Sequence, residues 1–248
     1  MKKKKSNPKH QRSRMIMGKN CVMEVVRSDP RRLIKVYLSA KDKSLWAKIE
    51  DTGAQVVGIS KPELNEIAKS ESHQGIVAFV QEKKQPTLED YLDSSFENDR
   101  DVILVLDSIY DPQNLGALMR AAECFGVGAV MWSKNRGTDL TPVVSKTSVG
   151  ASELVDIIRV SNLAEAVKRC KKDGYRVVTA EVGKEAVSLD EFSFPEKTLI
   201  IMGSEGEGVR DLLSKQANHK VYIPMKGAID SLNVSQATAV MLYKWAQA

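Results

Sequence analysis

Two glycine-bearing turns, each between an apolar run and a helical pattern, constrain the fold of this chain more than any other feature. The apolar runs Leu199–Met202 and Val221–Ile223 have the length of short strands. The glycines in the turns that follow are Gly203, Gly206, Gly208 and Gly227. Because glycine has no Cβ, backbone amides in such turns can approach a ligand closely. On these features alone, two ordinary strand-to-helix turns of an α/β domain and a ligand-binding pair of turns are equally good interpretations.

The residues of the two turns favour the interpretation as a ligand-binding pair. GSEGEGV follows the first run, and IPMKGAIDSLNVSQA contains the end of the second run and the turn after it. These segments resemble the second and third motifs of the SpoU-type RNA ribose 2'-O-methyltransferases, the TrmH/RlmB branch of the SPOUT class. The resemblance implies a C-terminal parallel-sheet domain with a deep trefoil knot, whose turns hold S-adenosylmethionine in a bent conformation. Knots are nearly absent among folds in general, so the knot is expected from the resemblance alone.

An earlier motif, NLGALMRAAECFG, adds two polar side chains to a helical pattern. Asn114 stands where a helix N-cap is expected, which is its ordinary structural interpretation. Arg120 lies four residues beyond Gly116, so its side chain leans over a turn of helix that carries almost nothing. We expect this space to admit a nucleotide beside the guanidinium. The segment matches the first motif of the same family residue for residue, which favours a functional Arg120 over a merely solvated one.

The resemblance implies methyl transfer to a ribose 2'-hydroxyl, an in-line displacement in which the enzyme must align the nucleophile and help its proton leave. Arginine stays protonated in proteins, so Arg120 is expected to hold the target phosphate and stabilise the developing alkoxide. Glu205 has two interpretations: it is a catalytic residue, or it is a carboxylate at the start of a helix, where the helix dipole favours a negative charge. The expected catalytic residues are Arg120, Asn114, Glu205, Ser231 and Asn233. The expected cofactor-binding residues, acting mainly through backbone groups, are Gly203, Gly208, Ile223, Met225 and Leu232.

The N-terminal part of the chain predicts a smaller α/β/α unit, because three strand patterns alternate there with helical ones. IMGKNCVMEVV and HQGIVAFV resemble the substrate-binding domain, similar to ribosomal protein L30e, of the rRNA-directed members. Asn20 stands where many relatives have a histidine, which weakens any role for that position. His73 is either an RNA contact or a structural loop histidine. The expected strands are Leu33–Leu38, Ala54–Ile59 and Gly75–Val80, and the expected helices are Ile16–Arg27, Leu45–Asp51 and Pro62–Ala68.

Charge divides the chain further. Met1–Arg14 carries seven Lys and Arg residues and no acidic one, so we expect a disordered tail, either an electrostatic arm for RNA phosphates or a solubilising extension. Glu82–Asp101 is rich in charge and contains Pro86, which predicts a linker with a short helix around Leu88–Leu92. The expected domains are the tail 1–14, the L30e-like substrate-binding domain 15–81, the linker 82–101 and the SPOUT methyltransferase domain 102–248.

The C-terminal part opens with Val102–Leu106, a continuous apolar run typical of a buried parallel strand. We expect Glu181–Lys197 to be irregular. The other expected strands are Gly128–Trp132, Glu153–Val160 and Arg176–Ala180, and the expected helices are Leu115–Phe125, Pro142–Val149, Leu163–Lys172 and Asn233–Gln247. The last helix has an apolar stripe that is either core or interface, and the resemblance implies the interface of a homodimer. The stripe consists of Val234, Ala237, Val240, Met241 and Trp245.

Some classes of protein are disfavoured by what the sequence lacks. No apolar run approaches ~20 residues, so no membrane span is expected, and the N-terminus lacks the apolar segment of a secretory signal. Cys21, Cys124 and Cys170 are scattered, which indicates reduced thiols in a cytoplasmic protein and no metal site. A Rossmann oxidoreductase is disfavoured because no GxGxxG motif follows an early strand with an acidic partner downstream.

The leading hypothesis is S-adenosylmethionine-dependent 2'-O-methylation of a guanosine in 23S ribosomal RNA by a cytoplasmic homodimer. A net charge of +5 agrees weakly with a polyanionic partner such as RNA. Transfer RNA is the alternative substrate. A non-catalytic RNA-binding assembly factor is the alternative function, and the presence of Arg120, Asn233 and the glycines argues against it.

Overall fold

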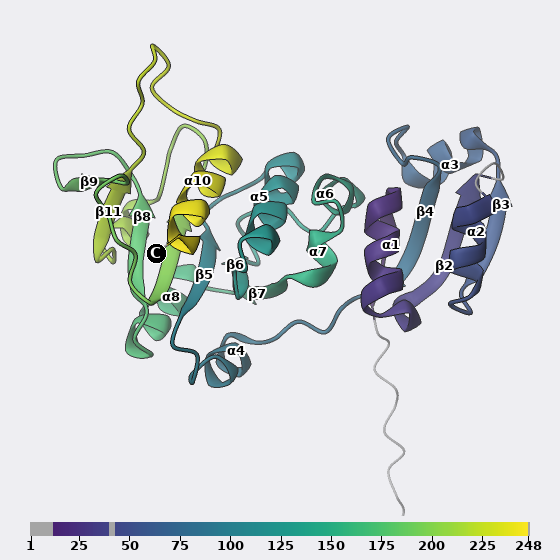
Figure 1. Ribbon diagram of the computed structural model, residues 1–248, viewed down its shortest axis with the longest axis horizontal. Helices are drawn as coiled ribbons and strands as arrows, with labels where there is room; N and C mark the ends of the chain where they lie inside the picture. The colour runs from purple at the N-terminus through teal and green to yellow at the C-terminus, as the bar shows by residue number, and fades with distance from the viewer. Residues whose placement is uncertain (1–11, 40–42, 248) are drawn as a thin grey trace, which may run out of the picture. The chain divides into compact units, whose positions relative to one another are not determined.

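The computed structural model describes residues 12–39 and 43–247. The chain divides into two compact units, with the boundary between Lys84 and Gln85, and Figure 1 shows the elements of each. Residues 1–11 of the expected basic tail lie outside the described residues. Ser13 and Arg14, which we assigned to that tail, belong instead to the first strand of the first unit.

The first unit is a four-stranded sheet in the order β1-β4-β2-β3, with helices on both faces. β4 pairs antiparallel with β1 and β2, whereas β2 and β3 are parallel. The apolar sides of α1 and α2 pack on one face and that of α3 on the other, which confirms the expected α/β/α layers. The strands are β1 Ser13–Met17, β2 Leu33–Ser39, β3 Gln55–Ile59 and β4 Ile76–Gln81, and the helices are α1 Lys19–Ser28, the 3-10 turn η1 Pro30–Arg32, α2 Lys43–Glu50 and α3 Lys61–Ala68.

The start of this unit corrects one expectation. The predicted helix Ile16–Arg27 was wrong at its beginning, because Ile16 and Met17 end strand β1 and pair with Ala78 and Val77 of β4. Gly18 then separates strand from helix with a φ of 98°, a conformation that glycine adopts at little cost. The apolar residues of this stretch are compatible with a helix and with a strand. Pairing with β4 makes Ile16 and Met17 part of a strand.

The second unit is built on a seven-stranded sheet in the order β7-β6-β5-β10-β8-β11-β9. Every strand pairing in this sheet is parallel. This confirms the expected α/β class with a parallel C-terminal sheet. The strands are β5 Asp101–Leu106, β6 Ala129–Ser133, β7 Asp156–Val160, β8 Arg176–Ala180, β9 Ala186–Ser188, β10 Lys197–Met202 and β11 His219–Tyr222.

Helices cover both faces of this sheet. α5, α6 and α10 contribute to one core cluster, and α4, α8 and α9 contribute to the other. Alternate residues of β5 enter the two clusters, which explains why its sequence is apolar throughout. The helices are α4 Leu88–Ser94, α5 Pro112–Cys124, α6 Pro142–Thr147, α7 Ala151–Leu154, α8 Leu163–Lys172, α9 Asp211–Ser214 and α10 Val234–Ala246. No described helix is long and apolar enough to cross a membrane.

Two further expectations for the second unit are corrected. The predicted strand Glu153–Val160 was wrong at its start, because Ala151–Leu154 is helix α7 and the strand begins at Asp156. The stretch Glu181–Lys197 is not wholly irregular, since it contains the three-residue strand β9, which pairs with β11. A strand this short has too few residues to display an alternating pattern.

The connections that leave the strands change direction at the middle of this sheet. β5 leads to β6 on one side, whereas β10 leads through α9 to β11 on the other. β5 and β10 are neighbours, so the loops that leave them diverge. In open α/β sheets, ligands bind outside the carboxyl ends of the strands at such a reversal.

Candidate active site

The first side chain at the carboxyl edge of this sheet comes from α5, which follows β5. Asp111 caps the helix by accepting the backbone N–H of Gln113 at 2.9 Å, and Pro112 occupies the first turn. The expected N-cap at Asn114 is therefore wrong, because that residue lies inside the first turn. Its side chain is free to act elsewhere, and its Nδ2 donates to Oε1 of Glu205 at 3.0 Å.

Asn233 completes this contact from a third segment. Its Oδ1 caps α10 by accepting the backbone N–H of Ser235 at 2.9 Å. Its Nδ2 donates to Oδ1 of Asn114 at 3.0 Å and to Oε1 of Glu205 at 2.5 Å. Three expected catalytic residues, one from each motif, thus form one network, which we call the Asn–Glu–Asn network. Glu205 serves this network and does not lie at the start of α9, which begins at Asp211.

The turn after β10 shows why its glycines are needed. Ser204 and Gly208 exchange backbone hydrogen bonds of 3.2 and 3.0 Å, which folds the turn back on itself. A Cβ on Gly203 would lie 2.0 Å from the carbonyl carbon of Gly208. Gly206 and Gly208 have φ values of 86° and 68°, and a Cβ on either would meet nothing within 4 Å. Gly203 is therefore required by the turn itself, while the other two leave its outer side open.

An ion pair between a buried carboxylate and a partly exposed arginine, which the motifs did not reveal, ties this turn to the end of β5. Asp107 is fully buried and follows the last residue of that strand. Its carboxylate accepts the backbone N–H of Arg210 at 3.0 Å and the Nε of the same residue at 2.7 Å. An acidic residue directly after a buried strand was the available signal. Its partner lies 103 residues away, and no local pattern identifies it.

Arg120 stands apart from the Asn–Glu–Asn network. It is exposed on α5, and no residue that the structure describes forms a hydrogen bond or an ion pair with it. The expected space beside it at Gly116 is filled, because a Cβ there would lie 2.6 Å from the Cβ of Thr147. Gly116 thus permits close packing of α5 on α6 and leaves no room for a nucleotide.

The remaining expected site residues lie in the loop 223–233, between β11 and α10. Ser231 is exposed and donates from Oγ to Oδ1 of Asp230 at 3.1 Å, so it does not join the network. Ile223 packs partly against the core, Met225 is half-buried, and Leu232 is exposed. This loop therefore exposes apolar side chains, and its last residue, Asn233, contacts Glu205 of the glycine turn.

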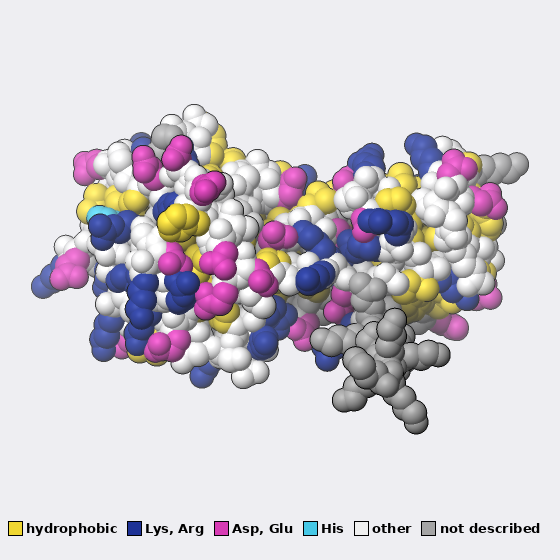
Figure 2. Space-filling view, turned by 90° about the horizontal axis from the view of Figure 1, so that it is seen from below, with side chains coloured by type: hydrophobic (Ala, Val, Ile, Leu, Met, Phe, Trp, Pro, Cys, Tyr) yellow, Lys and Arg dark blue, Asp and Glu magenta, His cyan; other side chains and the backbone are white. Residues whose placement is uncertain are grey.

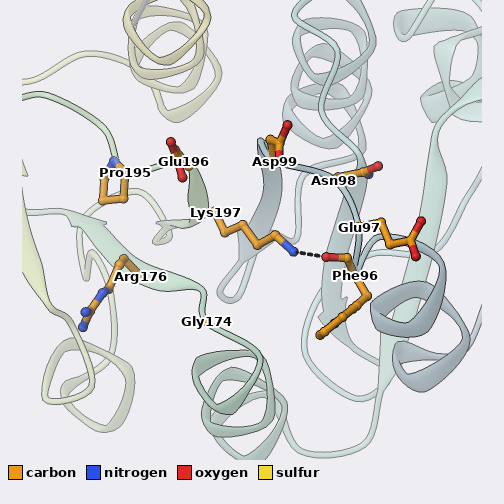
Figure 3. A pocket seen from close by; sticks show the side chains of 9 residues that line it. All are labelled: Phe96, Glu97, Asn98, Asp99, Gly174, Arg176, Pro195, Glu196 and Lys197. Atoms are coloured by element: carbon orange, nitrogen blue, oxygen red, sulfur yellow. Dashed lines mark hydrogen bonds between the residues drawn. The ribbon is translucent and has the colours of Figure 1, made fainter.

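Two hollows are lined by residues other than those of the Asn–Glu–Asn network. One, of about 550 Å³, lies at the amino ends of β5, β8 and β10, where Lys197 donates to the carbonyl of Phe96 at 2.7 Å; Figure 3 shows its lining. It is at the opposite edge of the sheet from the Asn–Glu–Asn network. Seen from below, the surface mixes basic and acidic side chains (Figure 2). The lining of the hollow itself combines acidic and basic residues and includes no member of the Asn–Glu–Asn network.

The other hollow, of about 570 Å³, is in the first unit beside His73. The imidazole is fully buried, with Nε2 at 2.8 Å from Oδ1 of Asn65 and Nδ1 accepting the backbone N–H of Gly75 at 3.0 Å. Burial lowers the pKa of His73, and the ammonium of Lys61 lowers it further. Of the two interpretations of this histidine, the structure favours the structural one.

Comparisons with known proteins agree with these motifs. The model of the SpoU rRNA Methylase family matches residues 101–243. A second model, RNA 2'-O ribose methyltransferase substrate binding, matches residues 15–86. The chain is similar to the 23S rRNA (guanosine-2'-O-)-methyltransferase RlmB of Coxiella burnetii, with 35% identity over 92% of this chain and 93% of that protein. It is 34% identical to the protein of the same name from Salmonella typhimurium, over 94% of this chain and 97% of that one.

Solved structures share the fold. The AdoMet-bound rRNA methyltransferase from Sinorhizobium meliloti superposes with a TM-score of 0.78 at 22% identity, covering 95% of this chain and 87% of that one. The SpoU methyltransferase AviRb from Streptomyces viridochromogenes also gives 0.78, at 17% identity, covering 95% and 89%. The motifs, the family models and the relatives that match over most of their length agree, and the chain belongs to the SpoU rRNA methylase family.

Proposed function

We propose that this protein methylates the ribose 2'-oxygen of a guanosine in 23S ribosomal RNA, with S-adenosylmethionine as the methyl donor. The observation that carries the proposal is the Asn–Glu–Asn network, which joins all three motifs at the carboxyl edge of the parallel sheet. The relatives named as 23S rRNA (guanosine-2'-O-)-methyltransferases supply the choice of RNA and nucleoside.

The residues at this edge suit the cofactor. The outer side of the glycine turn is open at Gly206 and Gly208. The loop 223–233 exposes apolar side chains to solvent. Apolar side chains can pack against the base of a nucleoside, and exposed backbone groups can form hydrogen bonds with its polar atoms. S-adenosylmethionine, when bound, supplies an activated methyl group. We assign its binding to Gly203, Gly208, Ile223, Met225 and Leu232.

The other expected site residues are assigned to positioning the loops and to binding the RNA. Asn114, Glu205 and Asn233 use their polar atoms on one another, so we assign them the role of fixing the three loops that surround the reacting groups. Arg120 has no partner among the described residues, so its guanidinium can bind a phosphate of the RNA and stabilise the alkoxide that forms on the ribose. Ser231 is exposed and is assigned to orienting the ribose.

Finer features of the fold are part of this proposal. A trefoil knot is supported by the path from β10 through β11 back to α10, which packs against α5. We assign an L30e-like substrate-binding domain to residues 15–81 and the methyltransferase domain to 102–248. The connection 82–101 contains α4, whose Tyr91 and Leu92 enter the core of the second unit. The basic residues that precede β1 are assigned to binding RNA phosphates. A ribosomal RNA substrate supports a cytoplasmic enzyme.

A homodimer also belongs to the proposal, but its support differs from the expected stripe. Met241 and Trp245 are buried in the core of their own unit. Tyr243 and Val240 are the large exposed apolar residues of α10, and the ring of Tyr243 packs edge-on against Phe125, the residue that follows α5. We place the interface on this side of α5 and α10.

The function is tested by mapping 2'-O-methyl groups in RNA from cells that have or lack the protein. We expect one guanosine of 23S RNA to lose its methyl group, to regain it with the wild-type protein and not to regain it with Arg120→Ala. The Arg120→Ala variant should still bind S-adenosylmethionine in calorimetry. Arg176→Ala is the control, an exposed arginine at the amino edge, and should restore the methyl group. Loss of the mark from transfer RNA, or full restoration by Arg120→Ala, would contradict the proposal.

A further inference from the structure

Tyr110 is an exposed aromatic residue at the carboxyl edge of the second unit. Its side chain is 60% exposed, between the buried Ile109 and the helix cap Asp111. No residue that the structure describes hydrogen-bonds with Tyr110 or stacks on its ring. Its exposure is therefore not explained by any role in holding this unit together.

The three residues before Tyr110 are held in place by contacts with other segments. Asp107 is tied to Arg210, and its backbone N–H donates to the carbonyl of Met202 at 2.9 Å. Ser108 has a φ of 64°, which a residue other than glycine adopts at a cost. The carbonyl of Ile109 accepts the N–H of Thr138 at 2.9 Å. Strain of this kind persists where the surroundings over-determine it, and it clusters at functional sites.

Tyr110 lies on the same loop as a residue of the candidate active site. Four residues beyond it, Asn114 enters the Asn–Glu–Asn network, so the loop that presents the ring also carries part of the site. A fixed loop loses little conformational entropy when a ligand binds. An aromatic ring held in this way provides a rigid surface for a flat partner.

We propose that Tyr110 is a stacking platform for a base of the substrate RNA bound at this edge. The proposal rests on the proposed function and adds a substrate-binding residue to it. Proteins recognise unpaired RNA by stacking splayed bases on aromatic side chains. Removing such a platform weakens binding by about 5- to 150-fold per base. The ring supplies affinity for RNA, while the cofactor is held by other residues.

The test measures binding of a short RNA that spans the mapped guanosine, with 2-aminopurine placed at its neighbours. We expect Tyr110→Ala to weaken binding by about 5- to 150-fold, to raise the KM for RNA and to abolish the fluorescence quenching that stacking causes. Tyr110→Phe keeps the ring and should restore binding and quenching. Calorimetry with S-adenosylmethionine shows whether the loss is confined to RNA.

Phe96→Ala is the matched control. Phe96 is 71% exposed but lies at the amino edge, in the hollow of Figure 3, so its removal should change neither binding nor quenching. A Tyr110→Ala variant that binds and quenches like the wild type would overturn the platform alone. So would an equal loss in Phe96→Ala. A wild-type protein that methylates no RNA would overturn the proposed function and the platform with it.

Discussion

The side-chain amide of Asn233 donates to the side-chain oxygen of Asn114 at 3.0 Å, across 119 residues of sequence. Both amides also donate to the same oxygen of Glu205. One carboxylate oxygen therefore holds the loops after β5, β10 and β11 together. The arrangement requires amide groups, because each asparagine uses its nitrogen as a donor and its oxygen as an acceptor.

Asn114→Asp should disrupt this network although it hardly changes the size of the side chain. The substitution removes the donor to Glu205 and places two carboxylates in contact. We expect a loss of about 1 kcal/mol in stability, together with weaker cofactor binding and slower methyl transfer. Asn98→Asp, an exposed change at the amino edge, is the control and should leave all three quantities unchanged. Equal behaviour of the two variants in urea unfolding and calorimetry would refute the role of the network.

Asp107→Ala should be the more damaging change for the fold. It removes the acceptor of the Arg210 side chain and backbone N–H from a fully buried position. Its removal leaves the backbone N–H of Arg210 without an acceptor, whereas the Arg210 side chain is one third exposed and can be hydrated, so we expect the free energy of unfolding to fall by about 1–3 kcal/mol. Asp211→Ala, one residue beyond Arg210 and exposed, should change it by less than about 0.5 kcal/mol. Urea denaturation compares them, and similar midpoints would contradict the assignment.

Gly203→Ala tests the close approach inside the turn. Its new Cβ would lie 2.0 Å from the backbone of Gly208, so the Ser204–Gly208 hydrogen bonds must open. We expect a loss of about 1–3 kcal/mol in stability and weaker binding of S-adenosylmethionine. At Gly183 a Cβ would meet nothing within 4 Å, so Gly183→Ala should bind the cofactor like the wild type. Normal cofactor affinity in Gly203→Ala would show that the turn tolerates reshaping.

The sequence was most informative where structure depends on local patterns. The apolar runs of β5 and β10 and the glycines after β10 predict strands and a tight turn, and the structure has them. Asn114, Glu205 and Asn233 were named as site residues from the motifs of a family, but the hydrogen bonds that join them were not predicted, because the three residues come from three distant loops.

Features that depend on contacts between distant segments were missed or misassigned. Gly116 was interpreted as space for a nucleotide, whereas α6 fills that space with Thr147. The last two residues of β1, Ile16 and Met17, were assigned to a helix, because the partner strand β4 lies some 60 residues later and decides their conformation. The pair of Asp107 and Arg210 depends on two neighbouring strand ends that only the fold brings together.

The structure changes how dimerisation must be tested. Charged substitutions at Met241 or Trp245 would disrupt the core of the second unit, since Met241 is 0% and Trp245 8% exposed. Tyr243 is 57% and Val240 39% exposed on the same helix. If two copies pack through α5 and α10, Val240→Glu with Tyr243→Glu should produce a folded monomer, because charge is disfavoured at the centre of an interface. Leu212→Glu, an exposed leucine on α9, is the control and should leave the assembly unchanged. Sedimentation equilibrium decides: a wild-type protein that sediments at 27.5 kDa at micromolar concentration while methylating RNA would exclude the dimer.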